Sequence, residues 1–170
     1  MHIEGLIISK TPYKERELIC NLLLRSGNTL SVYFYGGRGG GKNSKGSVLE
    51  VGHMLAITLS PRRKSLDTQI HISKEYKLLW ASNHTRLDYK AFYLSMFYME
   101  YISKVAQPED LDFESMENAG LFTVLSNSLF YLDKLVERKE FFLENHLFFF
   151  LTKLSIQLGV VPGIENCLYC

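Results

Sequence analysis

The chain has 170 residues, of which 46% are hydrophobic, and a formal net charge of +1. This composition is typical of a globular protein with one domain or two small ones. No apolar run approaches the ~20 residues that span a bilayer, and residues 1–5 carry an acid where a secretory leader would be basic. We therefore expect a cytoplasmic protein. Its cysteines, Cys20, Cys167 and Cys170, do not suggest a disulfide framework, and Cys20 is expected to be a small buried hydrophobe.

The two halves of the sequence carry opposite charges. Residues 1–80 hold 12 Lys and Arg against 6 acids, a balance of +6, whereas residues 81–170 hold 7 against 12, a balance of −5. Such asymmetry favours a first half that binds a polyanion. Ordinary surface chemistry produces the same pattern, so the charge balance alone does not decide the function.

The first half alternates short β-type runs with turn signals. We expect five strands, at residues 3–10, 18–25, 29–36, 51–60 and 68–73, with breaks at residues 11–13, 26–28, 36–46 and 60–65. Five short strands joined by basic loops are typical of an OB-fold, a small Greek-key barrel that binds oligonucleotides. An SH3-like barrel would give a similar pattern, and only the strand order distinguishes the two.

A glycine-rich loop follows the third expected strand. The spacing from Gly36 to Gly41 and Lys42 approaches the phosphate-binding motif G-x-x-x-x-G-K-[ST] of nucleotide hydrolases. Asn43 stands where that motif requires a hydroxyl, and a strand pattern rather than a helix follows, so we reject this function. Two interpretations remain open: a solvated flexible hairpin, and a cationic loop that contacts phosphates.

Two cation clusters lie between the expected strands. They comprise Arg38, Lys42 and Lys45 in the glycine-rich loop, and Arg62, Arg63 and Lys64 after the fourth strand. Cations in such loops can neutralise the phosphates of a nucleic acid backbone. Tyr33 and Tyr35 lie two apart on one face of the third strand, where bases can stack on them. Packing of both tyrosines on a half-buried sheet face is the alternative.

From about residue 76 the apolar period changes from two to 3.6, which predicts a helical region. Asp88 is expected to cap a first helix that ends before Pro108. A second helix carries Leu121 to Val136 on one face, after an acidic connector at residues 109–114. The third spans residues 141–158, ends at Gly159, and is unusually rich in phenylalanine. We expect its aromatic residues to be buried between the helices and the barrel; an exposed groove for a partner peptide is the alternative.

No set of residues points to covalent chemistry. The five histidines are scattered and lack the H-E-x-x-H spacing. The acidic residues between 109 and 117 are more typical of a charged connector than of a cation site. Cys167 and Cys170 form a C-x-x-C pair, which is half of a tetrahedral zinc site. Because the sequence stops at Cys170, we expect the natural protein to continue into a second pair, which zinc binding would require.

The order of these features resembles the bacterial RecO family of recombination mediators. The apolar start at residues 5–8, the hairpin at Ser26 and the basic glycine-bearing loop match its opening strands. More specifically, residues 150–154, Gly159, Pro162 and the C-x-x-C pair match in order its last long helix, its Gly-x-x-Pro turn and its first zinc-knuckle pair. The second cysteine pair and the final helices are missing, and the loop holds more glycine than is usual in the family.

The resemblance implies an α+β protein with an N-terminal OB-fold at residues 1–78 and a helical domain at residues 79–170. It further implies a nucleoid-associated, non-enzymatic protein that binds single- and double-stranded DNA and anneals complementary strands. The implied partners are RecR, the C-terminal tail of single-stranded DNA-binding protein and, indirectly, RecA. The DNA-binding residues that carry over are Arg38, Lys42 and Lys45 and, as a second group, Lys10, Lys14, Arg62, Arg63 and Lys64. A protein-interaction adaptor without DNA contact is the competing hypothesis.

Overall fold

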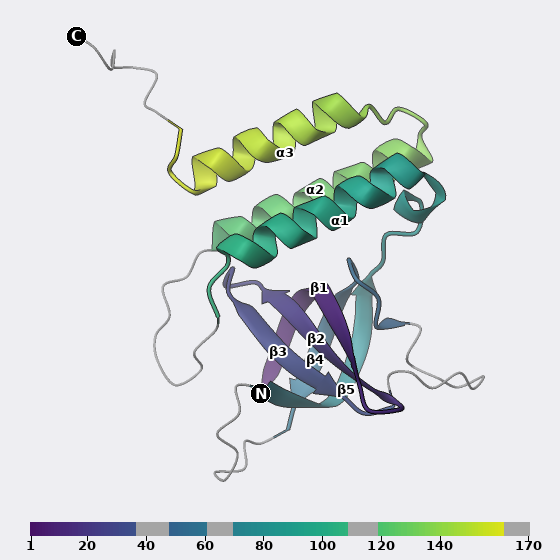
Figure 1. The fold of residues 1–170 in the computed structure, drawn as a ribbon, viewed down its shortest axis with the longest axis vertical. Coiled ribbons are helices and arrows are strands. Elements are labelled where there is room, and N and C mark those ends of the chain that lie inside the picture. Colours follow the sequence, from purple (N-terminus) through teal and green to yellow (C-terminus); the bar gives the residue numbers. More distant parts are fainter. Residues whose placement is uncertain (37–47, 61–69, 109–118, 162–170) are drawn as a thin grey trace.

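A computed structural model describes residues 1–36, 48–60, 70–108 and 119–161. These parts of the chain form a barrel that is followed by three α-helices (Figure 1). The strands are β1 (His2–Tyr13), β2 (Glu17–Leu24), β3 (Thr29–Phe34), β4 (Met54–Leu59) and β5 (Ile70–Trp80). A short 3-10 turn, η2 (Thr85–Leu87), leads into α1 (Tyr89–Val105), α2 (Ala119–Glu137) and α3 (Leu143–Gln157). No described helix is both long enough and apolar enough to span a membrane.

The strands close into a barrel in the order β1-β2-β3-β5-β4. β4 pairs antiparallel with β1 and closes the barrel, whereas β3 pairs parallel with β5. A parallel pair between the third and fifth strands is a feature of the OB-fold and not of an SH3-like barrel. The predicted fold class, a five-stranded OB-fold barrel followed by helices, is therefore confirmed.

The barrel encloses a core of its own because its strands alternate in burial. In β3 the side chains of Leu30, Val32 and Phe34 are buried, and the residues between them are partly exposed. Cys20 is fully buried in this core, and burial raises the pKa of its thiol to about 12. The thiol is thus a packing group, as expected, and not a reactive nucleophile.

Two strands are longer than the sequence pattern predicts. β1 continues through residues 11–13, where we expected a break, and Pro12 pairs with Leu18 of β2. Pro12 is tolerated because β4 pairs only with His2 to Leu6 of β1, so the missing N–H of Pro12 costs no ladder bond on that edge.

β5 also extends beyond the expected strand, because it runs to Trp80 and pairs with Met54 at its end. Tyr76, Leu78 and Trp80 alternate along a strand, whereas we assigned this stretch to the helical period. The expected domain boundary between residues 78 and 79 therefore lies inside β5. Conversely, β4 begins at Met54 and not at residue 51, because a turn with Gly52 at φ 87° precedes it.

The helices begin and end largely where the sequence predicts. Asp88 caps α1, its Oδ1 accepting a hydrogen bond of 2.9 Å from the backbone N–H of Ala91. Gly159 follows α3 with φ 68°, the left-handed conformation that glycine adopts at helix ends. After α1 the chain returns to the barrel, where the N–H of Thr29 donates to the Gln107 carbonyl over 2.7 Å. Helix α1 is thus fastened to the barrel at its C-terminal end.

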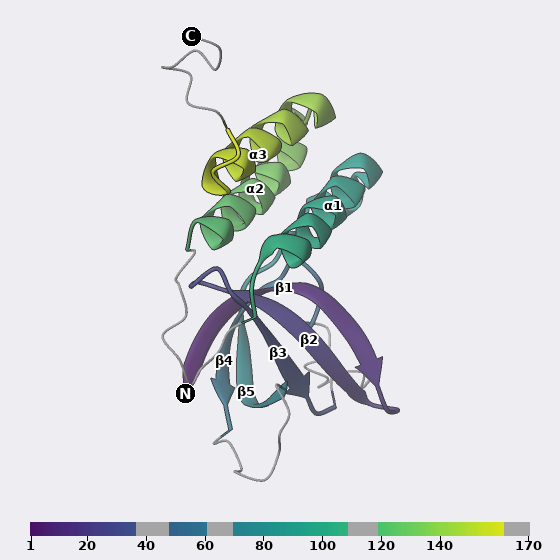
Figure 2. The same ribbon diagram turned by 60° about the vertical axis from the view of Figure 1, so that its left-hand side comes forward.

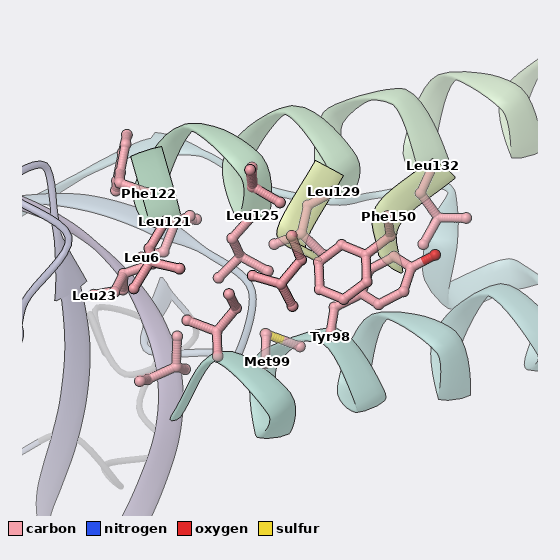
Figure 3. Close-up of a cluster of buried hydrophobic side chains, with 14 of the residues drawn as sticks. Leu6, Leu23, Tyr98, Met99, Leu121, Phe122, Leu125, Leu129, Leu132 and Phe150 are labelled. Carbon is pink, nitrogen blue, oxygen red and sulfur yellow. The ribbon is translucent and has the colours of Figure 1, made fainter. Parts of the chain in front are cut away.

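A second core joins the helices to the barrel. Figures 1 and 2 show α1 and α2 next to the barrel and α3 on the side away from it. Leu6 and Leu23 of the barrel pack with Leu121, Leu125 and other residues of the helices (Figure 3). Farther from the barrel, Tyr98 of α1 stacks on Phe150 of α3, with ring centroids 3.8 Å apart.

The phenylalanines of the third helix do not form the buried interface with the barrel that we expected. Phe150 is buried, but Phe142, Phe148 and Phe149 are exposed. The reason is that α3 packs on the other helices and not on the barrel, so only one side of it is covered.

Candidate nucleic-acid interface

Three tyrosines form a cluster on the outer face of the barrel: Tyr13 at the end of β1, Tyr33 on β3, and Tyr35 directly after β3. Tyr13 and Tyr35 are 44% and 62% exposed, and Tyr33 lies partly buried between them. The ring of Tyr33 meets the edges or faces of both neighbours, with centroids 5.7 Å from Tyr13 and 4.7 Å from Tyr35. Rings fixed by mutual packing offer preformed surfaces for stacking.

The strand register brings these side chains together. Tyr33 of β3 pairs with Ile19 of β2, and Ile19 pairs with Thr11 of β1. Tyr13 lies two residues beyond Thr11 and therefore points to the same outer face. The sequence indicated Tyr33 and Tyr35 by their spacing, but it missed Tyr13, because residues 11–13 were interpreted as a turn.

A polar ladder crosses the same face next to the tyrosines. Asn21 of β2 donates from Nδ2 to the Ser9 hydroxyl over 3.0 Å, and its Oδ1 accepts from the Ser31 hydroxyl over 2.6 Å. These bonds fix the orientation of the Asn21 amide. The ladder leaves further donor and acceptor capacity on all three side chains, which can meet base edges or sugar hydroxyls.

The helices cover one end of this face and leave the other open. Leu6, Ile8 and Leu23 belong to the core shared with the helices, and the polar ladder begins just beyond them. The change occurs at a register shift between Ile7 and Ser9, where Ile8 is left without a partner on β2. The outer face of β1, β2 and β3 thus passes from apolar, under α1 and α2, to polar and then aromatic at the β1–β2 hairpin.

Two cations, Lys14 and Arg16, and two acids, Glu15 and Glu17, lie at the aromatic end. Lys14 occupies the hairpin turn with φ 52°, and its Nζ lies 5.4 Å from the ring centre of Tyr13 and 4.0 Å from Oε2 of Glu17. Arg16 in the same turn is exposed. Desolvation, followed by the adjacent Glu17 carboxylate, raises the pKa of the Tyr33 hydroxyl, which therefore stays protonated and can donate.

The other described candidate, Lys10, lies in a different environment. It pairs with Cys20 across the ladder, so its side chain is on the opposite face of β1 from Tyr13. Its Nζ contacts Oε2 of Glu50 at 2.5 Å, and Arg86 lies 3.9 Å from the same oxygen. The structure therefore brings Lys14 to the tyrosine cluster and holds Lys10 in an ion-pair group elsewhere.

The remaining predicted site residues lie outside the described parts of the chain. They are Arg38, Lys42, Lys45, Arg62, Arg63, Lys64, Cys167 and Cys170. The first three follow Tyr35 in sequence after a single described residue, Gly36, which has φ 67°. Within residues 1–36, 48–60, 70–108 and 119–161, no group of three or more His, Cys, Asp or Glu side chains could hold a metal ion.

Comparisons with known proteins add little to this geometry. No family model matches the chain, and no curated protein matches it. Among solved structures, the S. pombe Stn1-ten1 complex is similar with a TM-score of 0.33 and 20% sequence identity, over 61% of this chain and 73% of that chain. A TM-score of 0.33 does not establish a shared fold. The fold assignment rests on the strand order of the barrel.

Proposed function

We propose that this chain is a non-enzymatic DNA-binding protein that holds DNA on the outer face of β1, β2 and β3. The observation that carries the proposal is the cluster of Tyr13, Tyr33 and Tyr35 beside the hairpin turn, in which Lys14 and Arg16 alternate with Glu15 and Glu17. The face formed by the second and third strands is where OB-folds generally bind oligonucleotides. Aromatic rings next to cations suit a single strand, in which bases and phosphates are both accessible.

Two interactions would contribute to the free energy of DNA binding on this face. A base stacked on an aromatic side chain contributes about 1–3 kcal/mol, whatever its identity. Each phosphate that a lysine or arginine neutralises releases counterions and adds to the salt dependence of binding. The chain supplies cations on both sides of the tyrosines in sequence, with Lys14 and Arg16 before Tyr33 and Arg38, Lys42 and Lys45 after Tyr35.

At a finer level we propose a recombination mediator of the RecO type, on the strength of the ordered sequence features given above. A cationic surface that binds two strands reduces their mutual repulsion, so it promotes annealing. In this role RecR and the C-terminal tail of single-stranded DNA-binding protein are the partners, and RecA loading is the outcome.

Fluorescence anisotropy with a labelled oligothymidine tests the DNA-binding face. We expect Tyr35→Ala to weaken binding by about 1–3 kcal/mol, or roughly 5- to 150-fold, through loss of stacking. Lys14→Gly removes one cation and also relieves the positive φ at that position, so it should make the salt slope shallower by about one phosphate contact. The triple change of Arg38, Lys42 and Lys45 to Ala should make it shallower still.

Tyr131→Ala is the matched control, because Tyr131 on α2 is 58% exposed, close to the value for Tyr35. It should leave affinity unchanged. Equal effects of Tyr35→Ala and Tyr131→Ala, or no effect of either, would place the site elsewhere.

The competing function is a protein-interaction adaptor without DNA contact. The exposed aromatic residues of the helices favour it, since large apolar surfaces mark protein contacts. An electrophoretic shift of single-stranded DNA at low salt distinguishes the two functions, because the adaptor produces no shift.

A further inference from the structure

Helix α1 carries large apolar side chains on its exposed side as well as on its buried side. Outward from the helix project six large residues: Tyr89, Phe92, Tyr93, Met96, Phe97 and Tyr101. Tyr89 and Tyr93 are each 69% exposed. An exposed helix side with this many large apolar residues is typical of a surface that another protein covers. Within the described parts of the chain, the inner side of α1 packs on the barrel and the other helices, and its outer side has no such cover.

The sequence of this helix is symmetric about Ser95. Residues 89–101 read Tyr-Lys-Ala-Phe-Tyr-Leu-Ser-Met-Phe-Tyr-Met-Glu-Tyr, so that similar side chains lie at equal separations on either side of the centre. Tyr89 corresponds to Tyr101, and Tyr93 corresponds to Phe97. The one pair that differs in kind is Lys90 and Glu100, and these two carry opposite charges.

On the exposed side of the helix, this arrangement suits a two-fold symmetric pair of antiparallel helices. In a two-fold interface the same surface is used by both copies, so a contact of one residue with another is repeated with the two copies exchanged. Lys90 and Glu100 are each five residues from Ser95, or about 7.5 Å along the axis at 1.5 Å per residue. Antiparallel pairing therefore brings each Lys90 to the level of the other copy's Glu100.

We propose that the chain forms a homodimer in which the exposed side of α1 packs antiparallel on α1 of a second copy, with the two-fold axis at the level of Ser95 along the helix. Tyr93 and Phe97 then meet across the axis at the centre, where aromatic residues are most enriched in interfaces. Lys90 and Glu100 lie at the margins and form two ion pairs. Both side chains are exposed, and in the described residues neither has an ion-pair partner within its own chain.

The charges also select the orientation. In a parallel pair Lys90 would face Lys90 and Glu100 would face Glu100, and both contacts would be repulsive. The antiparallel arrangement replaces two repulsions with two attractions. The proposed dimer is independent of the proposed DNA-binding function, because the β1–β2 hairpin lies at the end of the barrel away from α1 (Figure 1).

Sedimentation equilibrium of the 170-residue chain tests the dimer. We expect a mass twice that of the 19.6 kDa chain at protein concentrations up to about 100 μM, a range that detects any dimer with a Kd below that value. Tyr93→Glu with Phe97→Glu should give a monomer. A monomeric wild-type chain throughout this range would overturn the proposal.

A charge exchange tests the register. Lys90→Glu alone and Glu100→Lys alone should each raise the dimer Kd by roughly tenfold, because two ion pairs become two repulsions. The double variant Lys90→Glu with Glu100→Lys should restore the wild-type Kd. Failure of this rescue would overturn the antiparallel register.

Phe149→Glu provides the control for unspecific apolar association, since Phe149 on α3 is also exposed, at 62%. It should leave the mass doubled. If Phe149→Glu dissociates the dimer and the α1 variants do not, the interface is on α3 and the proposal is wrong. Circular dichroism of each variant confirms that the fold is retained.

Discussion

At the scale of single residues, a buried carboxylate connects the barrel to the helices. Oδ1 of Asp133 accepts hydrogen bonds from the backbone N–H groups of His84 and Thr85, both at 2.8 Å, and from the Thr85 hydroxyl at 3.0 Å. Asp133 belongs to α2, whereas His84 and Thr85 lie at the turn that leaves the barrel. Burial opposes ionisation of this carboxyl, but the hydrogen bonds from Thr85 and His84 outweigh burial and hold its pKa below the ordinary value.

We expect Asp133→Ala to lower the free energy of unfolding by about 2–4 kcal/mol, because it leaves three donors unsatisfied at a buried position. Asp88→Ala is the matched control, since it removes only the cap of α1 and should cost about 1 kcal/mol. Urea unfolding at pH 7 measures both. Equal losses in the two variants would contradict the connecting role of Asp133.

Ionisation of the Asp133 carboxyl makes the free energy of unfolding depend on pH. Because the folded pKa is depressed, the contribution of Asp133 is complete above its unfolded value near 3.8 and is lost as the pH falls through the folded pKa. The difference between the wild type and Asp133→Asn should therefore shrink below about pH 4.

A second buried titratable group lies between α1 and α3. His146 is 8% exposed, and its Nδ1 lies 2.8 Å from the Tyr98 hydroxyl, close enough for that hydroxyl to donate. Burial, and then the charge of Lys153, lower the pKa of His146, while a hydrogen bond with the Ser128 backbone acts in the opposite direction. His146 is therefore neutral in the folded protein at neutral pH.

We expect the melting temperature to fall between pH 7 and pH 5, in part because the unfolded chain protonates His146 near pH 6.5 and the folded chain resists it. His146→Gln keeps both hydrogen-bonding functions and does not titrate, so its melting temperature should fall less over this range. Thermal unfolding of both proteins across this range gives the comparison. An unchanged slope in His146→Gln would exclude His146 as a source of the acid sensitivity.

At the scale of elements, local chemistry made most of the fold predictable. Asp88 and Gly159 act on residues within one turn of themselves, and their effects as helix cap and helix stop were predicted correctly. The spacing along the third expected strand placed Tyr33 and Tyr35 on one face, and Tyr33 does lie on the partly exposed face of β3. Such features depend on only a few neighbouring residues, all of which the sequence displays.

The errors arose where distant parts of the chain decide the structure. Pro12 was interpreted as a turn because the sequence does not show that β4 leaves this edge of β1 unpaired. Trp80 was assigned to the helical region because its partner, Met54, lies 26 positions earlier. The connection through Asp133 could not be predicted for the same reason, since its partners are 48 and 49 residues away.

The candidate site, too, was predictable where it depends on neighbouring residues and not where it depends on strand pairing. The spacing of Tyr33 and Tyr35 suggested stacking, but the inclusion of Tyr13 and the exclusion of Lys10 depend on the β1–β2 register. That register fixes which face each β1 side chain occupies. An expected strand that ends at Lys10 does not include Tyr13 and so cannot place it.

At the scale of the whole molecule, the proposed DNA face and the proposed dimer face lie on different parts of the structure. The β1–β2 hairpin, which begins at Tyr13, lies at the end of the barrel away from the helices (Figure 2). The exposed residues of α1 belong to the helical layer. A dimer through α1 therefore carries two barrels whose tyrosine clusters both stay free. Such a dimer can hold one strand on each barrel, which keeps two complementary strands close together and raises their effective concentration.

The two faces should thus be separable by mutation in a strand-annealing assay with complementary labelled oligonucleotides. Tyr93→Glu with Phe97→Glu should retain the affinity of each chain for a short single strand, within about twofold, and should slow annealing by roughly tenfold or more because the effective concentration is lost. Tyr35→Ala should have the opposite effects: the affinity for DNA falls, and the dimer persists. Phe149→Glu should alter neither affinity nor annealing. If the monomeric variant anneals strands as fast as the wild type, annealing takes place on a single barrel and the dimer has another purpose.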